Sequence, residues 1–150
     1  MRANRAIPSG LLSWLRDDAR ADIYAGVRLA TRAGFGGVAV LRFTEDVDYW
    51  LEQARARSPH PEWLEGELAP ISERAQRALI TAVSDDGEAQ EGVGMNVVGI
   101  EDVDDGVRVA AYAPDEQAAQ AWLTDRYGPH VRVTYLGTTR PPGSGKLGPW

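Results

Sequence analysis

Two short apolar runs in the second half of the chain limit the folds that it can adopt. Residues 96–101 and 107–113 each have the length of a β-strand, and Asp105-Gly106 stands between them. Aspartate and glycine both tolerate positive φ, so this dipeptide is typical of a two-residue hairpin turn. The pattern therefore predicts a β-hairpin in this part of the chain.

A helix and a third strand are expected after this hairpin. Asp115 is suited to the start of a helix and Gly128 to its end, and residues 131–136 alternate with the period of a strand. Ala118 is expected on the inward face of the helix. The side chains expected to form one core, because they lie on the apolar faces of these elements, are Val97, Ile100, Val107, Val109, Trp122, Leu123, Val131 and Val133.

The first half of the chain shows the same order of elements. Residues 22–30 fit either a helical stripe or a strand face, and the Gly-rich loop at 31–37 favours the strand. With the apolar run 38–43, this segment predicts a second hairpin. Thr44 is expected to cap the helix that follows, and residues 63–71 to form a short strand. The apolar face of that helix consists of Val47, Trp50, Leu51 and Ala54.

Serine side chains mark the start of two more helices. Ser9 is expected to cap a helix near the N-terminus, and Ser72 to cap one that ends by Asp86-Gly87. The inward side chains expected on the second of these helices are Ala75, Ala78, Leu79 and Ala82.

These elements together predict an α+β protein. Its domain is expected over residues 22–137, in two hairpin–helix–strand halves at about 22–86 and 94–137. The sheet is expected to be mainly antiparallel with helices on one face, since this buries the apolar side of both kinds of element. Residues 1–21 predict a basic helical segment, and the Gly- and Pro-rich residues 138–150 predict a tail without regular structure.

Composition excludes several classes of function. The 150 residues carry 16 basic and 22 acidic side chains, a net charge of −6, which argues against a general nucleic-acid binder. The absence of cysteine excludes disulfides, thiolate metal sites and a thiol nucleophile. No apolar run approaches the roughly 18–20 residues of a membrane span. No signal peptide is apparent, so we expect a cytoplasmic protein.

No motif predicts a catalytic residue, a metal ligand or a cofactor. The glycines at 34–37 open a strand rather than a helix, as a dinucleotide fingerprint would require. The patterns HExxH and GxSxG are absent. Residues 84–107 hold eight acidic side chains and no lysine or arginine. This acidic segment fits a solvated loop and hairpin tip, or else a site for a cation or an electropositive partner.

Aromatic residues outside the expected core are the candidates for partner binding. Tyr49, Trp63 and Trp150 do not lie on a clear core face, and exposed Trp and Tyr are favoured as interface anchors. Leu147 and Trp150 could anchor the tail as an extended peptide, and open sheet edges could accept a partner's strand. The basic segment around Arg16 and Arg20 is the alternative interface.

Several segments resemble a known type of module. They are YAGVRL at 24–29, VAVLRFT at 38–44, VVGI at 97–100, GVRV at 106–109 and RYGPHVRV at 126–133. They are similar to small actinobacterial ferredoxin-like α/β modules, such as those in the prosegments of secreted bacterial chymotrypsin-like serine proteases. There such a module acts as a folding helper and as an inhibitor of its own protease. The resemblance implies ferredoxin-like halves and supplies no catalytic residue.

The sequence thus favours a non-catalytic protein-binding module of a bacterial protein, which the resemblance implies to be actinobacterial. An inhibitor, a chaperone-like protein and an immunity-type partner are all consistent with this role. The alternative is a small hydrolase, or a regulator that binds a ligand or metal through the acidic segment. The oligomeric state stays open.

Overall fold

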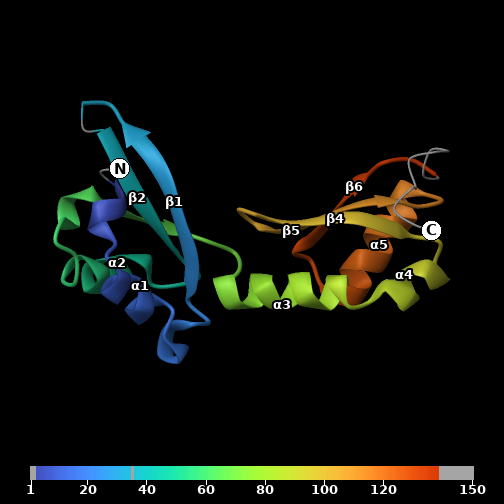
Figure 1. Ribbon diagram of the computed structural model, residues 1–150, viewed down its shortest axis with the longest axis horizontal. Helices are drawn as coiled ribbons and strands as arrows, with labels where there is room; N and C mark the ends of the chain where they lie inside the picture. The colour runs from blue at the N-terminus through green and yellow to red at the C-terminus, as the bar shows by residue number, and fades with distance from the viewer. Residues whose placement is uncertain (1–2, 35, 139–150) are drawn as a thin grey trace. The chain divides into compact units, whose positions relative to one another are not determined.

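The computed structural model describes residues 3–34 and 36–138 (Figure 1). The chain divides into two compact units at the bond between Ala75 and Gln76, which lies within helix α3 (Glu73–Ser84). Each unit has its own sheet and its own core. Within the described ranges, no helix combines the length and the apolar character needed to cross a membrane.

The first unit is a three-stranded sheet with short helices before and between its strands. The elements are η1 (Ala3–Ala6), α1 (Ser9–Leu15), η2 (Asp18–Arg20), β1 (Tyr24–Arg32), β2 (Gly36–Phe43), α2 (Val47–Arg55), η3 (Pro61–Trp63) and β3 (Leu64–Leu68). The strand order is β1-β2-β3. Strand β1 runs antiparallel to β2, with Leu29 opposite Ala39, and β3 runs parallel to β2, with Leu64 opposite Ala39.

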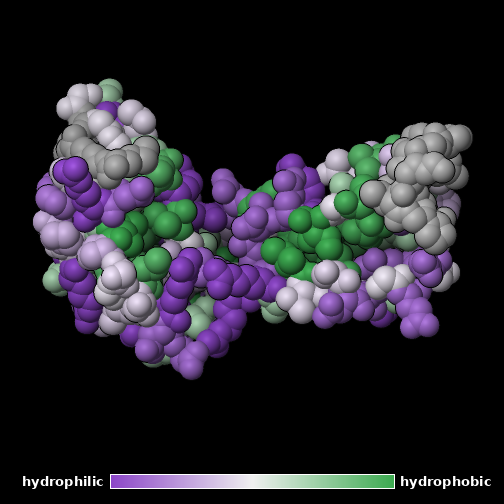
Figure 2. Space-filling model, viewed as in Figure 1, coloured by the Kyte–Doolittle hydropathy of each residue, from purple (hydrophilic) through white to green (hydrophobic). Residues whose placement is uncertain are grey.

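The second unit repeats the hairpin–helix–strand order of the first. Its elements after α3 are α4 (Gly87–Gly92), β4 (Asn96–Val103), β5 (Gly106–Tyr112), α5 (Glu116–Tyr127) and β6 (Val131–Tyr135). The strand order is β4-β5-β6, with β4 antiparallel and β6 parallel to β5. Val98 and Leu136 are exposed apolar residues here, and Figure 2 shows hydrophobic side chains over these strands.

The α+β class and the hairpin–helix–strand order are confirmed, but the sheets are mixed rather than mainly antiparallel. In each unit the third strand returns after a helix to lie beside the second strand. A helical crossover between neighbouring strands makes them parallel, whereas a tight turn makes them antiparallel. Each sheet therefore contains one antiparallel and one parallel pair.

The core of the first unit lies on one face of its sheet. Ala39, Leu41 and Phe43 alternate along β2 toward this face and are fully buried. Helices η1, α1 and α2 cover them with Ala3, Ala6, Leu11, Leu15, Leu51 and Ala54. The basic N-terminal segment is thus part of the first unit, because its apolar side chains complete this core.

A glycine allows α2 to lie close against β3. A Cβ on Gly66 would come within 2.7 Å of Val47 Cγ1 and 3.2 Å of Leu51 Cδ2. Real Cβ atoms do not come as close to carbon as 2.7 Å, so a side chain here would require Val47 or the helix to shift. The absence of a side chain at Gly66 therefore permits the close approach of α2 to β3.

All eight side chains predicted for the core of the second unit lie in it. Val107, Val109, Leu123 and Val131 are fully buried, while Val97, Ile100, Trp122 and Val133 are partly buried against them. The prediction for Ala118 is wrong, because it is exposed and its neighbour Ala119 faces the core. The helix turns 100° per residue, so a shift of one position moves a side chain off the core face.

The turn of the β4–β5 hairpin is one residue earlier than predicted. Val103 pairs with Gly106, so Asp104-Asp105 forms the turn. Gly106 is needed for another reason, since it has a φ of 156° and a Cβ there would lie 2.0 Å from the carbonyl oxygen of His130. That carbonyl accepts a hydrogen bond from the backbone N–H of Val107 at 2.8 Å.

The predicted helix starts are right in some places and wrong in others. Ser72 Oγ accepts from the N–H of Ala75 at 3.1 Å, and Asp115 Oδ2 from that of Ala118 at 2.8 Å, so both cap their helices. Thr44 does not cap α2, because its hydroxyl donates to the carbonyl of Asp22 at 3.1 Å. Ser9 is the first residue of α1, and Pro8 occupies the cap position.

The inward face of α3 differs from the prediction. Leu79, Ile80 and Val83 contact the core of the second unit, whereas Ala75, Ala78 and Ala82 are exposed. The helix ends at Ser84, and the short α4 follows. The larger apolar side chains take the inward positions because they bury more area than alanine does.

Candidate functional site

Helix α2 carries Tyr49, the more exposed of the two candidate binding aromatics that lie among the described residues. Tyr49 is 58% exposed. Its ring meets that of Trp50 edge to face, with 4.9 Å between the centroids. Trp50 is partly buried against the core, as its position on the apolar face of α2 predicts. The edge contact therefore joins an exposed ring to one that the core holds in place.

The aromatic surface continues from α2 onto α1. Trp14 lies 6.2 Å from Trp50, centroid to centroid. Two guanidinium groups approach the Trp14 ring, Arg57 at 4.0 Å and Arg20 at 4.2 Å. Both distances are within the range of a cation–π interaction. We call Tyr49, Trp50 and Trp14 the aromatic row, with Arg57 and Arg20 beside its last ring.

The row is formed by α2, the turn that follows it, and α1. Trp50 lies on α2 and Arg57 lies two residues past the end of this helix, and both side chains contact Trp14. Arg57 Nη1 donates to the carbonyl of Gln53 at 2.8 Å, and Arg20 Nε donates to that of Trp14 at 2.6 Å. These bonds hold both guanidinium groups near the indole.

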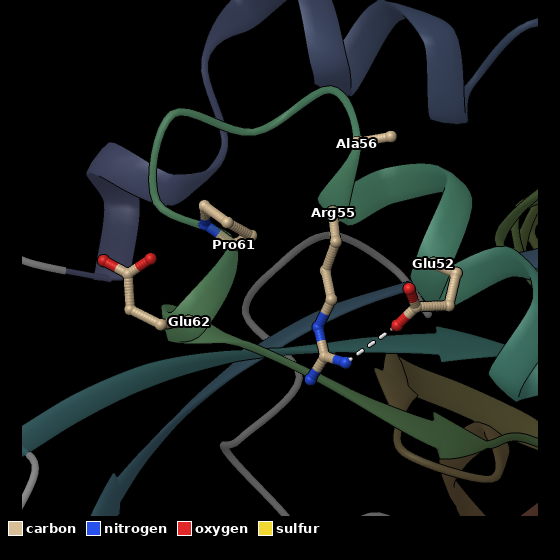
Figure 3. A pocket seen from close by; sticks show the side chains of 5 residues that line it. All are labelled: Glu52, Arg55, Ala56, Pro61 and Glu62. Atoms are coloured by element: carbon tan, nitrogen blue, oxygen red, sulfur yellow. Dashed lines mark hydrogen bonds and ion pairs between the residues drawn. The ribbon is translucent and has the colours of Figure 1, made fainter.

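An open hollow lies on the adjacent side of α2, between this helix and η3 (Figure 3). Glu52, Arg55 and Ala56 line it from the helix, and Pro61 and Glu62 line it from η3. Arg55 Nη1 donates to Glu52 Oε1 at 3.0 Å, and its Nη2 donates to the carbonyl of Leu64 at 2.9 Å. Arg55 thereby ties α2 to the first residue of β3, and its buried Nε has no hydrogen-bond partner within the described ranges.

The predicted partner-binding residues are placed as follows. Tyr49 is on α2 and Trp63 is in η3, the two elements that border the hollow. Trp63 ends η3 and precedes the strand in which it was expected, because β3 begins at Leu64. Its ring stacks on His60 at 3.9 Å and packs partly against the core. Leu147 and Trp150 lie outside the described residues.

The sequence does not reveal the part of Trp14 and Trp50 in this surface. The sequence pattern places Trp50 on the apolar face of its helix. The side chain is partly buried against the core, but its ring also contacts Tyr49. The available signal is the pair Tyr49-Trp50 on an amphipathic helix with Arg57 two turns later. The alternative interface around Arg16 and Arg20 is divided, since Arg16 pairs with Glu73 at 2.9 Å and only Arg20 contacts the row.

The opposite face of the first sheet carries a network of ion pairs. Glu67 on β3 accepts from Arg28 on β1 and from Arg42 on β2. The hydrogen bonds from Arg28, followed by those from Arg42, lower the pKa of the Glu67 carboxyl to about 2 against the opposing effect of burial. Arg32 on β1 pairs with Glu65 on β3 at 2.6 Å. The Glu67 carboxyl therefore stays ionised at neutral pH.

Strand β1 is at the edge of its sheet and exposes apolar side chains on the core side. Val27 and Leu29 are opposite the buried Leu41 and Ala39, yet they are 39% and 46% exposed. The helices of the first unit cover β2 but leave these two side chains open. An edge strand with exposed apolar residues is a surface on which a partner strand can add.

In the second unit, one residue of the acidic segment belongs to a polar cluster. Asp86 accepts hydrogen bonds from Arg126 and, at 2.5 Å, from the hydroxyl of Tyr127. These bonds, that of Arg126 above all, lower the pKa of Asp86. Burial and the bond to Asp86 raise the pKa of Tyr127, so the phenol stays protonated as a donor. The cluster joins the end of α5 to the turn between α3 and α4.

The remaining acids are spread along the α3–α4 connection, α4 and the β4–β5 hairpin. Glu101 pairs with Arg108 at 3.3 Å. In the part of the chain that the structure describes, no three histidine or carboxylate side chains come together as metal ligands do. Comparisons with protein-family models, with curated proteins and with solved structures found no match.

Proposed function

We propose that this chain is a non-catalytic protein-binding module that binds its partner through the aromatic row on α2 and α1. The observation that carries the proposal is the chain of contacts from the exposed Tyr49 to Trp50, from Trp50 to Trp14, and from Trp14 to the stacked Arg57. Tyr, Trp and Arg are the residue types that dominate the binding energy of protein interfaces. Here all three types lie together on α2, on α1 and on the segments that directly follow these helices.

The rigidity of the row also supports the proposal. Trp50 and Trp14 pack against the core on one side, and Arg57 is hydrogen-bonded to Gln53. Association costs free energy for each side chain that must be ordered. Since the core and these bonds already restrict the side chains, a partner loses less on binding to them than to mobile ones.

The proposal includes the class of partner that the resemblance implies. An inhibitor, chaperone-like or immunity-type role in the cytoplasm of an actinobacterium fits a module that binds another protein. The hairpin–helix–strand order of each unit is the part of the ferredoxin-like resemblance that supports this kinship. Trp63, on the other side of the hollow, is proposed as a second contact, and Leu147 and Trp150 as contacts from the tail.

The test begins with the purified chain as bait in an actinobacterial lysate, followed by calorimetry with each purified candidate. Tyr49→Ala should weaken the affinity for a genuine partner at least tenfold, about 1.4 kcal/mol, because it removes the exposed end of the row. Its melting temperature should stay the same. Leu136→Ala removes an exposed apolar side chain of the second unit and serves as the matched control.

Two results would contradict the proposal. One is a stoichiometric partner whose affinity is the same for the wild type, Tyr49→Ala and Trp63→Ala. The other is a large thermal shift with a small ligand or a metal ion and no protein partner, which favours a regulator that acts through the acidic segment.

A further inference from the structure

The two ends of the aromatic row differ in charge. Glu45, Asp46 and Asp48 are exposed at the start of α2, next to Tyr49. No ion pair joins these three carboxylates to a basic side chain within residues 3–34 and 36–138. The Tyr49 end of the row is therefore negative.

The other end of the row is positive. Arg57 is exposed and stacks on Trp14. Its Nη1 donates hydrogen bonds to the carbonyl oxygen and the side-chain oxygen of Gln53. Among the described side chains, no carboxylate forms an ion pair with it. Arg20 lies on the same ring, and its own carboxylate partner, Asp17, is 3.6 Å away. The charge of Arg57 is thus available to a group that approaches the row from outside.

The charges favour a peptide over a nucleic acid as the occupant. A single-stranded nucleic acid would find aromatic rings and guanidinium groups here, which are the features it uses. Its phosphates would also meet Glu45, Asp46 and Asp48 at the other end, where like charges repel. A protein segment can carry a different charge at each end, so it can complement both.

We propose that the aromatic row binds a protein segment of opposite charge polarity. Its acidic end lies at Arg57 on the Trp14 ring, its apolar or aromatic centre lies on Trp50 and Tyr49, and its basic end lies at Glu45 and Asp48. This inference rests on the proposed function and adds the chemistry of the partner. The row then selects its partner by charge order as well as by apolar contact.

The test uses three synthetic peptides that share a central Leu-Phe-Leu segment. One has acidic residues at one end and lysines at the other, one has acidic residues at both ends, and one has lysines at both ends. Binding is followed by calorimetry and by the tryptophan fluorescence of the full chain, at low and high salt. We expect the bipolar peptide to bind about threefold to tenfold more tightly than the other two, and salt to remove this preference.

Charge reversal in the protein makes the test independent of stability. Arg57→Glu should make the doubly basic peptide the tightest ligand. The double variant Glu45→Lys/Asp48→Lys, which leaves only Asp46 negative at that end, should do the same for the doubly acidic peptide. Arg132→Glu, an exposed site on β6, is the matched control and should leave the order unchanged. A gain of affinity for one peptide cannot come from a loss of folding.

Three results would overturn the inference: an order of peptides that Arg57→Glu does not change, tighter binding of a thymidine oligonucleotide than of any peptide, and no binding of any peptide at millimolar concentration. The proposed function is tested separately with the natural partner. If Tyr49→Ala weakens that partner but the charge variants have no effect, only the inference fails. If neither Tyr49→Ala nor Arg57→Glu affects the partner, both fail.

Discussion

Arg28 and Glu67 form a two-point ion pair across the middle strand of the first sheet. Arg28 Nη2 lies 2.7 Å from Glu67 Oε1, and Arg28 Nε lies 3.2 Å from Oε2, although their strands, β1 and β3, are separated by β2. By register, Arg28 is opposite Val40, so its aliphatic part passes over β2. Val38 and Val40 on this face are only 1% and 2% exposed. Arginine stems can cover apolar surface in this way while their charged ends stay hydrated.

The low pKa of Glu67 makes the stability of the first unit depend on pH. Its folded pKa of about 2 lies below the ordinary value of 4.5. The stabilisation is therefore complete above pH 4.5 and is lost as the pH falls toward 2. The side chain is 34% exposed, so solvent screening limits the contribution to about 1 kcal/mol.

Glu67→Gln tests this directly by urea denaturation between pH 2 and 7. The variant should lose about 1 kcal/mol at pH 7 and show a smaller loss of stability on acidification than the wild type. Glu91→Gln, at an exposed position in α4 with no ion pair among the described side chains, is the control and should follow the wild-type curve. Parallel curves for the wild type and Glu67→Gln would show that the ion pair does not stabilise the fold.

The order of elements in each unit is predictable from the sequence, because it depends on local periodicity. The exact positions of turns and caps depend on distant groups. Asp105-Gly106 has the composition of a turn, but the carbonyl of His130 requires the glycine and moves the turn to Asp104-Asp105. Thr44 has the composition of a cap, but the carbonyl of Asp22 takes its hydroxyl.

The candidate site is predictable only in part, for the same reason. Tyr49 is recognisable because it lies off the apolar face of its helix. The row also needs Trp14, which comes from α1 and reaches Trp50 only when the two helices pack on one core. No local sequence pattern predicts this contact between Trp14 and Trp50. The parallel direction of β3 likewise depends on which strand of the sheet it pairs with.

Gly106→Ala should destabilise the second unit by about 3 kcal/mol. The new methyl group would collide with the His130 carbonyl, and the φ of 156° is strained for any side chain. Urea denaturation measures the loss. Gly10→Ala is the control, since nothing lies within 4 Å of that Cβ and alanine in helix α1 should add about 0.5–1 kcal/mol. A Gly106→Ala variant as stable as the wild type would contradict the close contact between Gly106 and the His130 carbonyl.

Tyr127→Phe should raise the pKa of Asp86 part of the way to its ordinary value. The variant loses the hydrogen bond that the phenol donates, while Arg126, the larger cause of the low pKa, remains. NMR titration of the Asp86 carboxyl measures the change. The loss of this hydrogen bond should also cost about 1 kcal/mol of unfolding free energy. Tyr112→Phe is the control, and an unchanged Asp86 titration in Tyr127→Phe would contradict the assigned contact.

Leu64→Ala and Leu123→Ala should destabilise different parts of the chain. Both leucines are fully buried, Leu64 in the core of the first unit and Leu123 in that of the second, and the two cores share no residue. Each truncation should cost about 2–5 kcal/mol, because it leaves a cavity that its neighbours fill only partly. The cavity weakens the contacts of its own core and leaves those of the other core in place.

Hydrogen exchange with peptide-level resolution separates the two effects, because it reports the free energy of opening for each segment. Leu64→Ala should speed exchange in β1–β3 and spare β4–β6, and Leu123→Ala should do the reverse. Leu68→Ala and Leu136→Ala, which remove leucines that are exposed in the first and second unit, are the matched controls. Faster exchange throughout the chain in either core variant would mean that the two units unfold as one, because the loss in one core would then be transmitted to the other.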